Sequence, residues 1–192
     1  MGIRDLILQN RSCRRFEQNQ RIPRKLLRQW IDLARLSPSA SNLQPLKYVI
    51  SSDAQTNTKI FSTLSWAGYL TDWPGPAEGE RPAAYIVILA DKNIKFPIDC
   101  DHGIAAQSIL LGAVESGYRG CIIGSVKRPE LKRHLQLPDS LEILLVLALG
   151  KCKEKVVLEA VDAAGDIRYW RDEQGVHHVP KRGLDEIIVK EY

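Results

Sequence analysis

Apolar and polar positions follow different periods along the chain, and these periods predict its main helices and strands. Within residues 23–36 apolar side chains recur every three or four positions, as in a helix with one buried face. Residues 99–116 are apolar on nearly every side, so we expect the longest helix to be buried, in a core or between subunits. The near-continuous apolar run at 141–149 is typical of a strand covered on both faces.

Shorter patterns predict the remaining elements. We expect short helices at 3–9, from the N-cap Asp53 to about residue 64, and at 129–135. We expect strands at 48–51, 84–90 and 186–189, a hairpin formed by 167–171 and 176–179, and a loop rich in Gly, Pro and Trp at 66–81. Residues 120–124 form a short apolar segment. Strands mingled with helices predict an α+β or α/β sandwich, and the absence of a repeat or linker predicts one domain over 1–192.

The composition is that of a globular protein. The chain has 192 residues, of which 44% are hydrophobic and 26% charged, enough for one well-buried domain and short for two. No apolar run approaches the roughly 20 residues of a membrane helix. The first residues lack the apolar core of a signal peptide, and Leu6 stands where a myristoylation signal has Ser or Thr. We therefore expect a cytoplasmic protein.

Positive charge is concentrated at the start of the chain. Residues 1–50 carry ten Lys and Arg against three Asp and Glu, a net +7, and the rest of the chain sums to −3. This bias indicates an anionic ligand or a nucleic-acid surface near the N-terminal segment. No helix-turn-helix, zinc-finger or RNP-type motif is visible in the sequence, and a phosphate-bearing small molecule explains the bias at least as well.

The cysteines are widely spaced and form no C-x-x-C pair; they are Cys13, Cys100, Cys121 and Cys152. In a chain without a secretion signal this spacing predicts reduced thiols. The stretch Asp-Cys-Asp-His at 99–102 matches no zinc or calcium spacing. We interpret it as a helix start with acidic residues at the positive end of the dipole, and we expect no metal site.

Two basic stretches carry candidate binding chemistry. In R-S-C-R-R-F at 11–16, guanidinium forks and a hydroxyl suit a phosphate, although a basic cluster taken alone is more often a solvated loop. Near the other end of the chain, Lys181 and Arg182 follow His177 and His178. Adjacent residues on a strand face opposite sides, so structural histidines are favoured over a shared metal site.

Two further stretches carry turn chemistry. The connector S-P-S-A-S-N-L-Q-P at 37–45 holds two prolines and two side-chain amides, more than a plain turn requires. The segment G-C-I-I-G-S at 120–125 lacks the G-x-G-x-x-G spacing of a dinucleotide loop. Its glycines suit either the close approach of backbone N–H groups to a flat ligand or the two ends of a buried strand.

Taken in order, these stretches resemble the nitroreductase family of FMN-dependent oxidoreductases. The matching features are R-S-x-R-x-F from Arg11, P-S-x-x-N-x-Q-P from Pro38, the long apolar helix, the G-C-x-x-G-S turn and the C-terminal basic pair. They extend from Arg11 to about Val189. The resemblance implies an α+β three-layer sandwich with a mostly antiparallel central sheet flanked by helices. It also implies an intertwined homodimer, with the long helix in its interface and two FMN sites, each made from both chains.

The resemblance assigns two groups of FMN-binding residues. The phosphate and ribityl chain are held by Arg11, Ser12, Arg14, Lys181 and Arg182. The ring system and ribityl chain are met by a loop of the partner subunit, and the flavin ring also faces the backbone amides of a turn; these residues are Pro38, Ser39, Ala40, Asn42, Ile123 and Gly124. Residues 66–69 would lie along the pyrimidine edge, and the prolines of the 37–45 connector would fix its loop against a flat ring.

Two positions depart from the family pattern. Asn10 stands where members often carry a basic residue, which weakens the expected phosphate contact slightly. Leu46 stands where an aromatic residue commonly follows Q-P, which removes a packing landmark.

The implied activity is an FMN-dependent oxidoreductase that works by two half-reactions. NAD(P)H delivers hydride to flavin N5, and a small oxidised substrate such as a nitroaromatic or a quinone then takes two electrons; no side chain is expected to be catalytic. The alternatives are reductive dehalogenation or flavin fragmentation on the same fold, with 70–82 as the lid, a flavin-binding module without turnover, and a nucleic-acid-binding protein. The sequence leaves the substrate and the choice between NADH and NADPH open.

Overall fold

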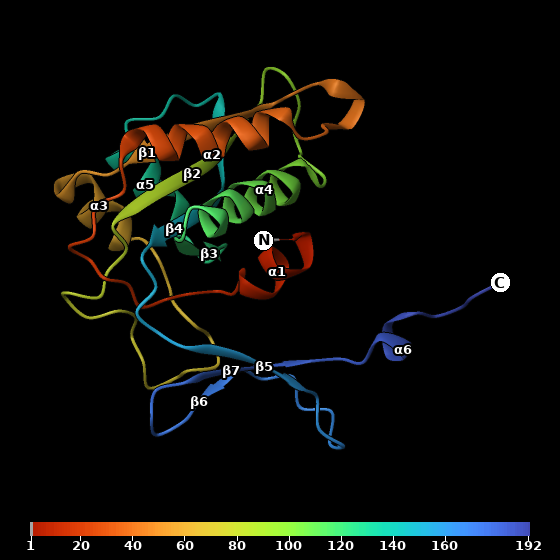
Figure 1. Cartoon of the computed structure of the whole chain (residues 1–192). Coiled ribbons are helices and arrows are strands. Elements are labelled where there is room, and N and C mark those ends of the chain that lie inside the picture. Colours follow the sequence, from red (N-terminus) through yellow and green to blue (C-terminus); the bar gives the residue numbers. More distant parts are fainter. Residues whose placement is uncertain (1) are drawn as a thin grey trace.

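A four-stranded antiparallel sheet forms the centre of the computed structural model, which describes residues 2–192. Its strand order is β1-β2-β4-β3, from β1 (Leu46–Ser51), β2 (Ala84–Asp91), β4 (Leu141–Gly150) and β3 (Arg119–Ile123) (Figure 1). All three pairings are antiparallel, with one register shift between Ile88 and Leu89. The expected mixture of helices with a mostly antiparallel central sheet is confirmed.

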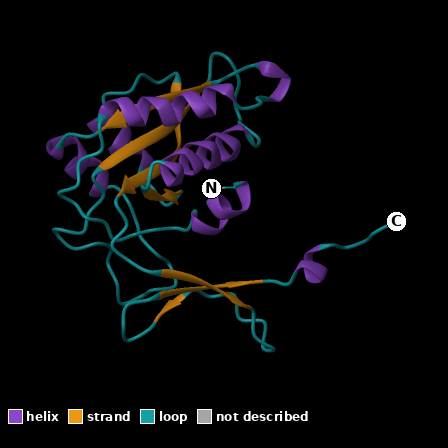
Figure 2. Ribbon diagram, in the orientation of Figure 1, coloured by secondary structure: helices purple, strands orange, loops and turns teal. Residues whose placement is uncertain are grey.

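Helices cover both faces of this sheet, as Figure 2 shows. The helices α2 (Arg24–Leu36) and α4 (Asp101–Glu115) pack on one face, whereas α3 (Ala54–Phe61) and α5 (Arg128–His134) lie on the other. Strand β2 explains how two cores form, because successive side chains of a strand point to opposite faces. Ile86 and Ile88 enter the core with α2 and α4, whereas Val87 and Leu89 enter the second core.

The local signals used to predict these elements are visible in the structure. The apolar face of α2 buries Leu27, Trp30 and Ala34, and most of α4 is buried within the chain, as its all-round apolar pattern predicted. The Asp53 carboxylate accepts a hydrogen bond of 2.8 Å from the Thr56 N–H and so caps α3. The first helix, α1 (Ile3–Gln9), packs beside α4.

A second, smaller sheet lies apart from the first and is built from the last quarter of the chain (Figure 1). In it β7 (His177–Lys181) pairs in parallel with β5 (Val156–Ala160) and antiparallel with β6 (Trp170–Arg171). The predicted hairpin is therefore confirmed, with a shorter first strand. Strand β5 was not predicted, because its partner β7 lies about twenty residues further along the chain and no local turn marks the pairing.

One predicted strand is wrong. Residues 186–189 were expected to be extended, whereas the structure has α6 (Leu184–Ile187) at this position. The backbone N–H of Ile188 bonds to the carbonyl of Leu184, and the Gly183 N–H bonds to the Glu186 carboxylate. These local hydrogen bonds outweigh the strand preference of the two isoleucines and Val189, which have no neighbouring strand to pair with.

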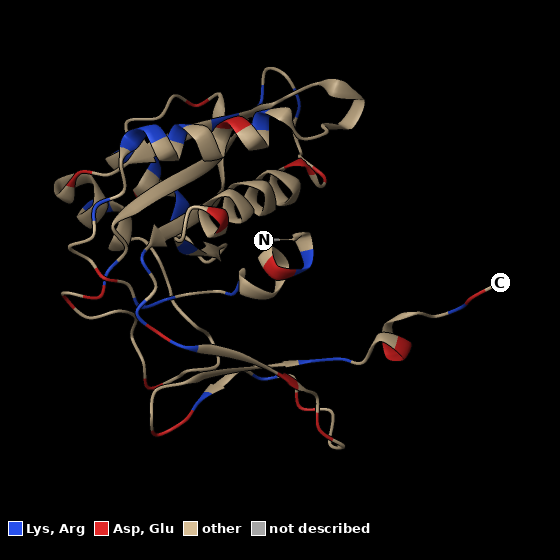
Figure 3. Cartoon of the chain, in the orientation of Figure 1, with Lys and Arg blue, Asp and Glu red and all other residues tan. Residues whose placement is uncertain are grey.

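The remaining short element is η1, a 3-10 helix (Ala40–Asn42) between α2 and β1. No helix within residues 2–192 is both long and apolar enough to cross a membrane. Figure 3 shows that Lys and Arg are spread over α2 as well as over the N-terminal segment. The charge bias of residues 1–50 is therefore only partly located at the candidate site, because Arg24, Lys25, Arg28 and Arg35 lie on α2.

Candidate functional site

The N-terminal motif forms an extended connector between α1 and α2 that is held against β3. Ser12 bridges Gly120 in a parallel arrangement, and the Cys13 N–H donates to the Gly120 carbonyl at 3.0 Å. A Cβ atom on Gly120 would lie 2.8 Å from the Ala148 carbonyl oxygen and 2.6 Å from a Leu110 methyl carbon. The connector therefore runs alongside a position of β3 that only glycine can occupy.

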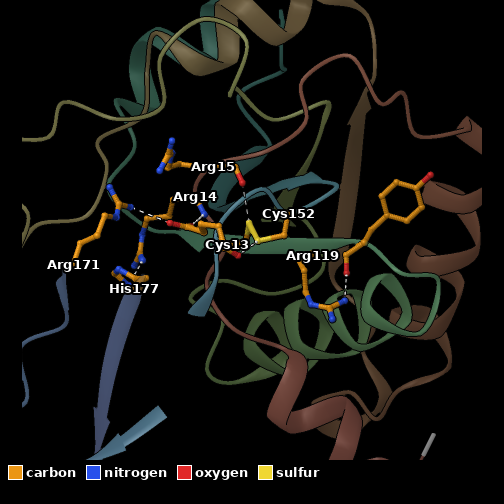
Figure 4. Close-up of a disulfide and its surroundings, with 9 residues drawn as sticks. Cys13, Arg14, Arg15, Arg119, Cys152, Arg171 and His177 are labelled. Atoms are coloured by element: carbon orange, nitrogen blue, oxygen red, sulfur yellow. Dashed lines mark hydrogen bonds and ion pairs between the residues drawn. A yellow bond between two sulfur atoms is a disulfide. The ribbon is translucent and has the colours of Figure 1, made fainter. Parts of the chain in front are cut away.

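A disulfide between Cys13 and Cys152 corrects the expectation that these thiols are reduced (Figure 4). The two cysteines are 139 residues apart, and the bridge between Phe16 and Cys152 brings their strands together. Sequence spacing carries no information on such a pairing because only the folded chain makes the two side chains neighbours. Cys100 and Cys121 are free, the first exposed and the second buried.

A cavity of about 330 Å³ opens beside this connector and collects residues from both ends of the chain. Four of the predicted phosphate-binding residues line it: Arg11, Ser12, Arg14 and Lys181. The other lining residues are Asn10, Gln107, Leu110, Gly120, Ile122, Tyr169, His177 and Val179. No carboxylate lines the cavity, so three cationic side chains and several neutral polar ones surround a space without an acidic partner.

Arg14 is the most buried of these cations, with 9% of its surface exposed. Its backbone N–H donates to the Glu154 carboxylate, and its Nη1 lies 3.1 Å from His177 Nε2 (Figure 4). Its guanidinium carbon lies 4.8 Å from the centre of the Tyr169 ring. Within the described chain the Arg14 guanidinium makes no ion pair, so its charge has no counterion in the protein.

His177 is 1% exposed and stays neutral. Burial, followed by the charges of Arg14 and Arg171, lowers the pKa of His177 to about 4. Its neighbour His178 faces the other side of β7, where it contacts Glu159 and lies 3.1 Å from the Asp172 carboxylate. The two histidines face opposite sides of β7, as expected. Residues 2–192 hold no cluster of three or more metal-capable side chains.

The other cations are held less firmly. Arg11 donates from Nη2 to the Ile7 carbonyl at 2.9 Å, whereas its buried Nε has no partner in the described chain. Lys181 is exposed at the end of β7. Arg182 does not line the cavity; its Nη1 bonds at 2.7 Å to the Glu186 carboxylate on α6. The structure thus separates the two members of the C-terminal basic pair.

The 37–45 connector lies elsewhere, at the end of α2. Ser39 Oγ donates to Asp101 at 2.6 Å, and the Ala40 N–H donates to the same carboxylate at 3.1 Å. Burial disfavours the charge of Asp101, but these hydrogen bonds outweigh it and hold the pKa of Asp101 below its usual range. Pro38 and Ser39 line a small cavity that shares no residue with the one at Arg14.

The backbone of this connector is unusual. Ser41, Asn42 and Gln44 have φ angles of 51°, 54° and 53°, in the left-handed region that residues other than glycine rarely adopt. Gln44 donates from its amide to the carbonyl and to the side chain of Asn42, so it fixes the loop from within. Ser41, Asn42 and Gln44 are exposed, and the loop presents a strained, preformed surface outward from the chain.

The remaining predicted positions are at the end of β3. Ile123 is buried in the core that α3 and α5 share with the sheet, whereas Ile122 faces the cavity. Gly124 is exposed and its carbonyl accepts a hydrogen bond from Arg128 at 3.2 Å. The sequence did not indicate that Tyr169, Gln107 and His177 line the cavity. Nothing in the residues around Tyr169, which is followed by Trp170 and Arg171, signals its contact with Arg14.

The predicted lid is packed against both ends of the chain. Arg15 pairs with Glu80 at 2.6 Å, and the Arg171 guanidinium lies 4.8 Å from the Trp73 ring. Just before this segment, the Tyr69 ring packs at a tilt against Tyr169, with 4.9 Å between ring centres. Because Tyr169 lines the cavity, the start of the loop meets the cavity wall through an aromatic side chain.

The sequence matches the model of the Nitroreductase family over residues 7–68 and 78–151. A protein of Archaeoglobus fulgidus whose provisional name is NADH dehydrogenase/NAD(P)H nitroreductase is 28% identical, with 87% of this chain and 95% of that protein covered. An iodotyrosine dehalogenase 1 homolog of Caenorhabditis elegans is also 28% identical, with 77% of this chain covered. The chain spans about half of that relative's length, since 54% of it is covered.

Solved structures of the family share the fold. A nitroreductase family protein of Clostridium difficile 630 superposes with a TM-score of 0.72 at 18% identity, covering 100% of this chain and 99% of that one. An FMN-dependent nitroreductase of Clostridium difficile R20291 gives a TM-score of 0.62 at 21% identity, over 78% of this chain and 87% of that one. With the family model matched along most of its length, the chain belongs to the nitroreductase family.

Proposed function

We propose that this protein is an FMN-dependent oxidoreductase, and the observation that carries the proposal is the cation-lined cavity at Arg14. A phosphate monoester carries two negative charges and accepts several hydrogen bonds, and Arg presents paired donors that match its oxygens. Arg11, Arg14 and Lys181 surround the cavity without a carboxylate, and the buried Nε of Arg11 lacks a partner within the described chain. This donor set fits the phosphate end of FMN, which is also the cofactor in the name of one structural neighbour.

Bound FMN would supply the redox chemistry, taking two electrons as hydride from NADH or NADPH and passing them to a small oxidised substrate such as a nitroaromatic or a quinone. The protein's residues bind and orient. Arg11, Arg14 and Lys181 would hold the phosphate, and the Ser12 hydroxyl would donate to it. Arg182 would join them only after leaving Glu186. The backbone amides of Ile123 and Gly124 would lie near the ring, where preorganised dipoles stabilise developing charge.

We further propose a single-domain chain that works as a homodimer. Pro38, Ser39, Ala40 and Asn42 lie away from the Arg14 cavity in their own chain, so they would serve the cavity of a partner subunit. Large apolar side chains are exposed on α1 and α2, as expected of a surface that a partner covers; they are Ile3, Ile7, Leu8, Leu33 and Leu36. Light scattering coupled to gel filtration would measure the assembly, and a monomer that retains FMN would contradict it.

The deciding experiment is an absorption spectrum of the purified protein, followed by mass identification of the released chromophore. We expect a yellow protein that releases FMN. Arg14→Ala should lose most of its bound FMN, whereas Arg133→Ala, an exposed arginine on α5, should retain it. A protein that stays colourless after incubation with FMN would refute the proposal, as would normal flavin content in Arg14→Ala.

A second candidate reaction, reductive dehalogenation, is favoured by the similarity to the iodotyrosine dehalogenase homolog. Anaerobic turnover of a nitroaromatic, a quinone and a halotyrosine, each with NADH and with NADPH, separates the two reactions. Reduction by dithionite alone, with neither nicotinamide active, would indicate a flavin-binding module without turnover.

A further inference from the structure

We propose that His177 is a positioning residue that, together with the Tyr169 ring, fixes the Arg14 guanidinium for the phosphate of the ligand. The inference rests on the proposed function, because it concerns the phosphate end of the FMN site. It adds to the N-terminal motif two residues that the family pattern did not indicate, His177 at the start of β7 and Tyr169 just before β6.

A buried arginine is usually paired with a carboxylate. The buried carboxylate of Glu154 contacts the main chain of Arg14 but is used by other groups. It accepts the backbone N–H of Arg14 and makes an ion pair of 2.9 Å with Arg171, and its side chain is completely buried. Glu154 therefore anchors the main chain of Arg14 and leaves its guanidinium without a counterion.

Neutral groups take the place of that counterion. Arg14 Nη1 lies 3.1 Å from His177 Nε2, and the Tyr169 ring lies over the guanidinium at 4.8 Å. A guanidinium has no acceptor, so Nε2 must accept and the proton of the neutral imidazole must be on Nδ1. The two neighbours thus orient the guanidinium while its full positive charge remains available to an anion.

The surroundings of His177 keep it in this neutral state. The charged and titratable groups around it are Arg14, Arg171 and His178, and Tyr169 packs beside it with 5.2 Å between ring centres. Two arginines next to a buried imidazole disfavour a third positive charge. The backbone N–H of His177 donates to the Lys155 carbonyl at 2.8 Å, which fixes the residue at the start of β7, the central strand of the second sheet.

The test compares ligands that differ only in the phosphate. FMN and riboflavin are titrated into apoprotein, and the quenching of flavin fluorescence gives each Kd. His177→Phe keeps a ring but removes the acceptor, so we expect its Kd for FMN to rise about tenfold or more, as for a lost hydrogen bond to a charged group. Its Kd for riboflavin should change less than about twofold. His177→Gln restores an acceptor and should keep the Kd for FMN within about threefold of the wild type.

Two controls separate positioning from a structural role. His178→Phe changes the neighbouring histidine on the opposite face of β7 and should leave the Kd for FMN unchanged. In the Arg14→Ala background, His177→Phe should cause no further loss, because it acts through Arg14. If His177→Phe does not fold, His177→Leu removes the same acceptor.

The outcomes distinguish this inference from the proposed function. Equal losses of FMN and riboflavin affinity in His177→Phe, or full additivity with Arg14→Ala, would overturn the positioning role. Failure of the wild-type apoprotein to bind FMN would instead overturn the proposed function itself.

Discussion

The disulfide between Cys13 and Cys152 should contribute a large share of the protein's stability, because it closes a loop with a sequence separation of 139 residues. In the chain-entropy model a closed loop of that length lowers the entropy of the unfolded chain by an amount worth about 5 kcal/mol at 25 °C. Removing a native disulfide typically lowers the free energy of unfolding by about 2–5 kcal/mol, so we expect a loss of at least about 2 kcal/mol here. A typical domain has only about 5–15 kcal/mol of net stability, which makes the effect easy to detect.

The assay is urea unfolding of the wild type with and without a dithiol reductant, alongside the Cys13→Ala/Cys152→Ala double variant. Reduced wild type and double variant should unfold at similarly lowered urea concentrations. Cys100→Ala, at an exposed free cysteine outside the disulfide, should match the wild type in each condition, oxidised and reduced. Identical unfolding midpoints for oxidised and reduced wild type would refute the reasoning, and so would mass analysis that finds four free thiols in the purified protein.

Three further predictions follow from packing, titration and hydrogen bonding. In Gly112→Val the new Cβ would lie 2.5 Å from a Leu33 methyl carbon and 3.0 Å from a ring carbon of the buried Trp30, so these side chains must shift and the variant should lose about 1–3 kcal/mol in urea unfolding. Gly103→Ala, in open space on the same helix, should lose nothing. Because the pKa of His177 falls from 6.5 to about 4 on folding, the unfolded state binds its proton first as the pH falls, and stability should decrease between about pH 6.5 and 4 and then level off. His177→Gln should lack this component, worth about 2 kcal/mol between pH 6.5 and 5, and an identical pH dependence of unfolding would contradict the assignment. Ser39→Ala removes the donor to Asp101 and the acceptor of the Gln44 N–H, so the free energy of unfolding should fall by about 1–2 kcal/mol. Proteolysis within residues 37–45 should become faster, and an unchanged cleavage rate would show that these hydrogen bonds do not hold the loop.

The sequence predicted the elements whose signals are local. The apolar stripe of α2, the apolar run of β4 and the Asp53 cap each depend on residues a few positions apart, and all three are present in the structure. The strand expected at 186–189 was wrong because a short run of β-branched residues does not distinguish a strand without a partner from a single helical turn. Strand β5 was missed for the opposite reason, since its only support is a distant parallel neighbour.

The candidate site divides in the same way. The order of the motifs along the chain indicated four binding residues that line one cavity in the structure: Arg11, Ser12, Arg14 and Lys181. Arg182 was expected beside them, but a glutamate four residues further along competes for it. The Cys13–Cys152 disulfide and the contact of Arg14 with His177 join residues more than a hundred positions apart, and no spacing rule in a single sequence connects such pairs.

The contact of Arg14 with Tyr169 and His177 determines when the cavity can form during protein synthesis. Tyr169 and His177, which flank the Arg14 guanidinium, are synthesised more than 150 residues after Arg14. At the usual rates of translation this interval lasts roughly 10–30 s. During that time α2 and the strands of the first sheet can begin to fold, while the cavity at Arg14 has no wall from the second sheet. If this cavity holds a phosphate-bearing cofactor as proposed, the cofactor would bind and stabilise only molecules whose synthesis has reached the second sheet.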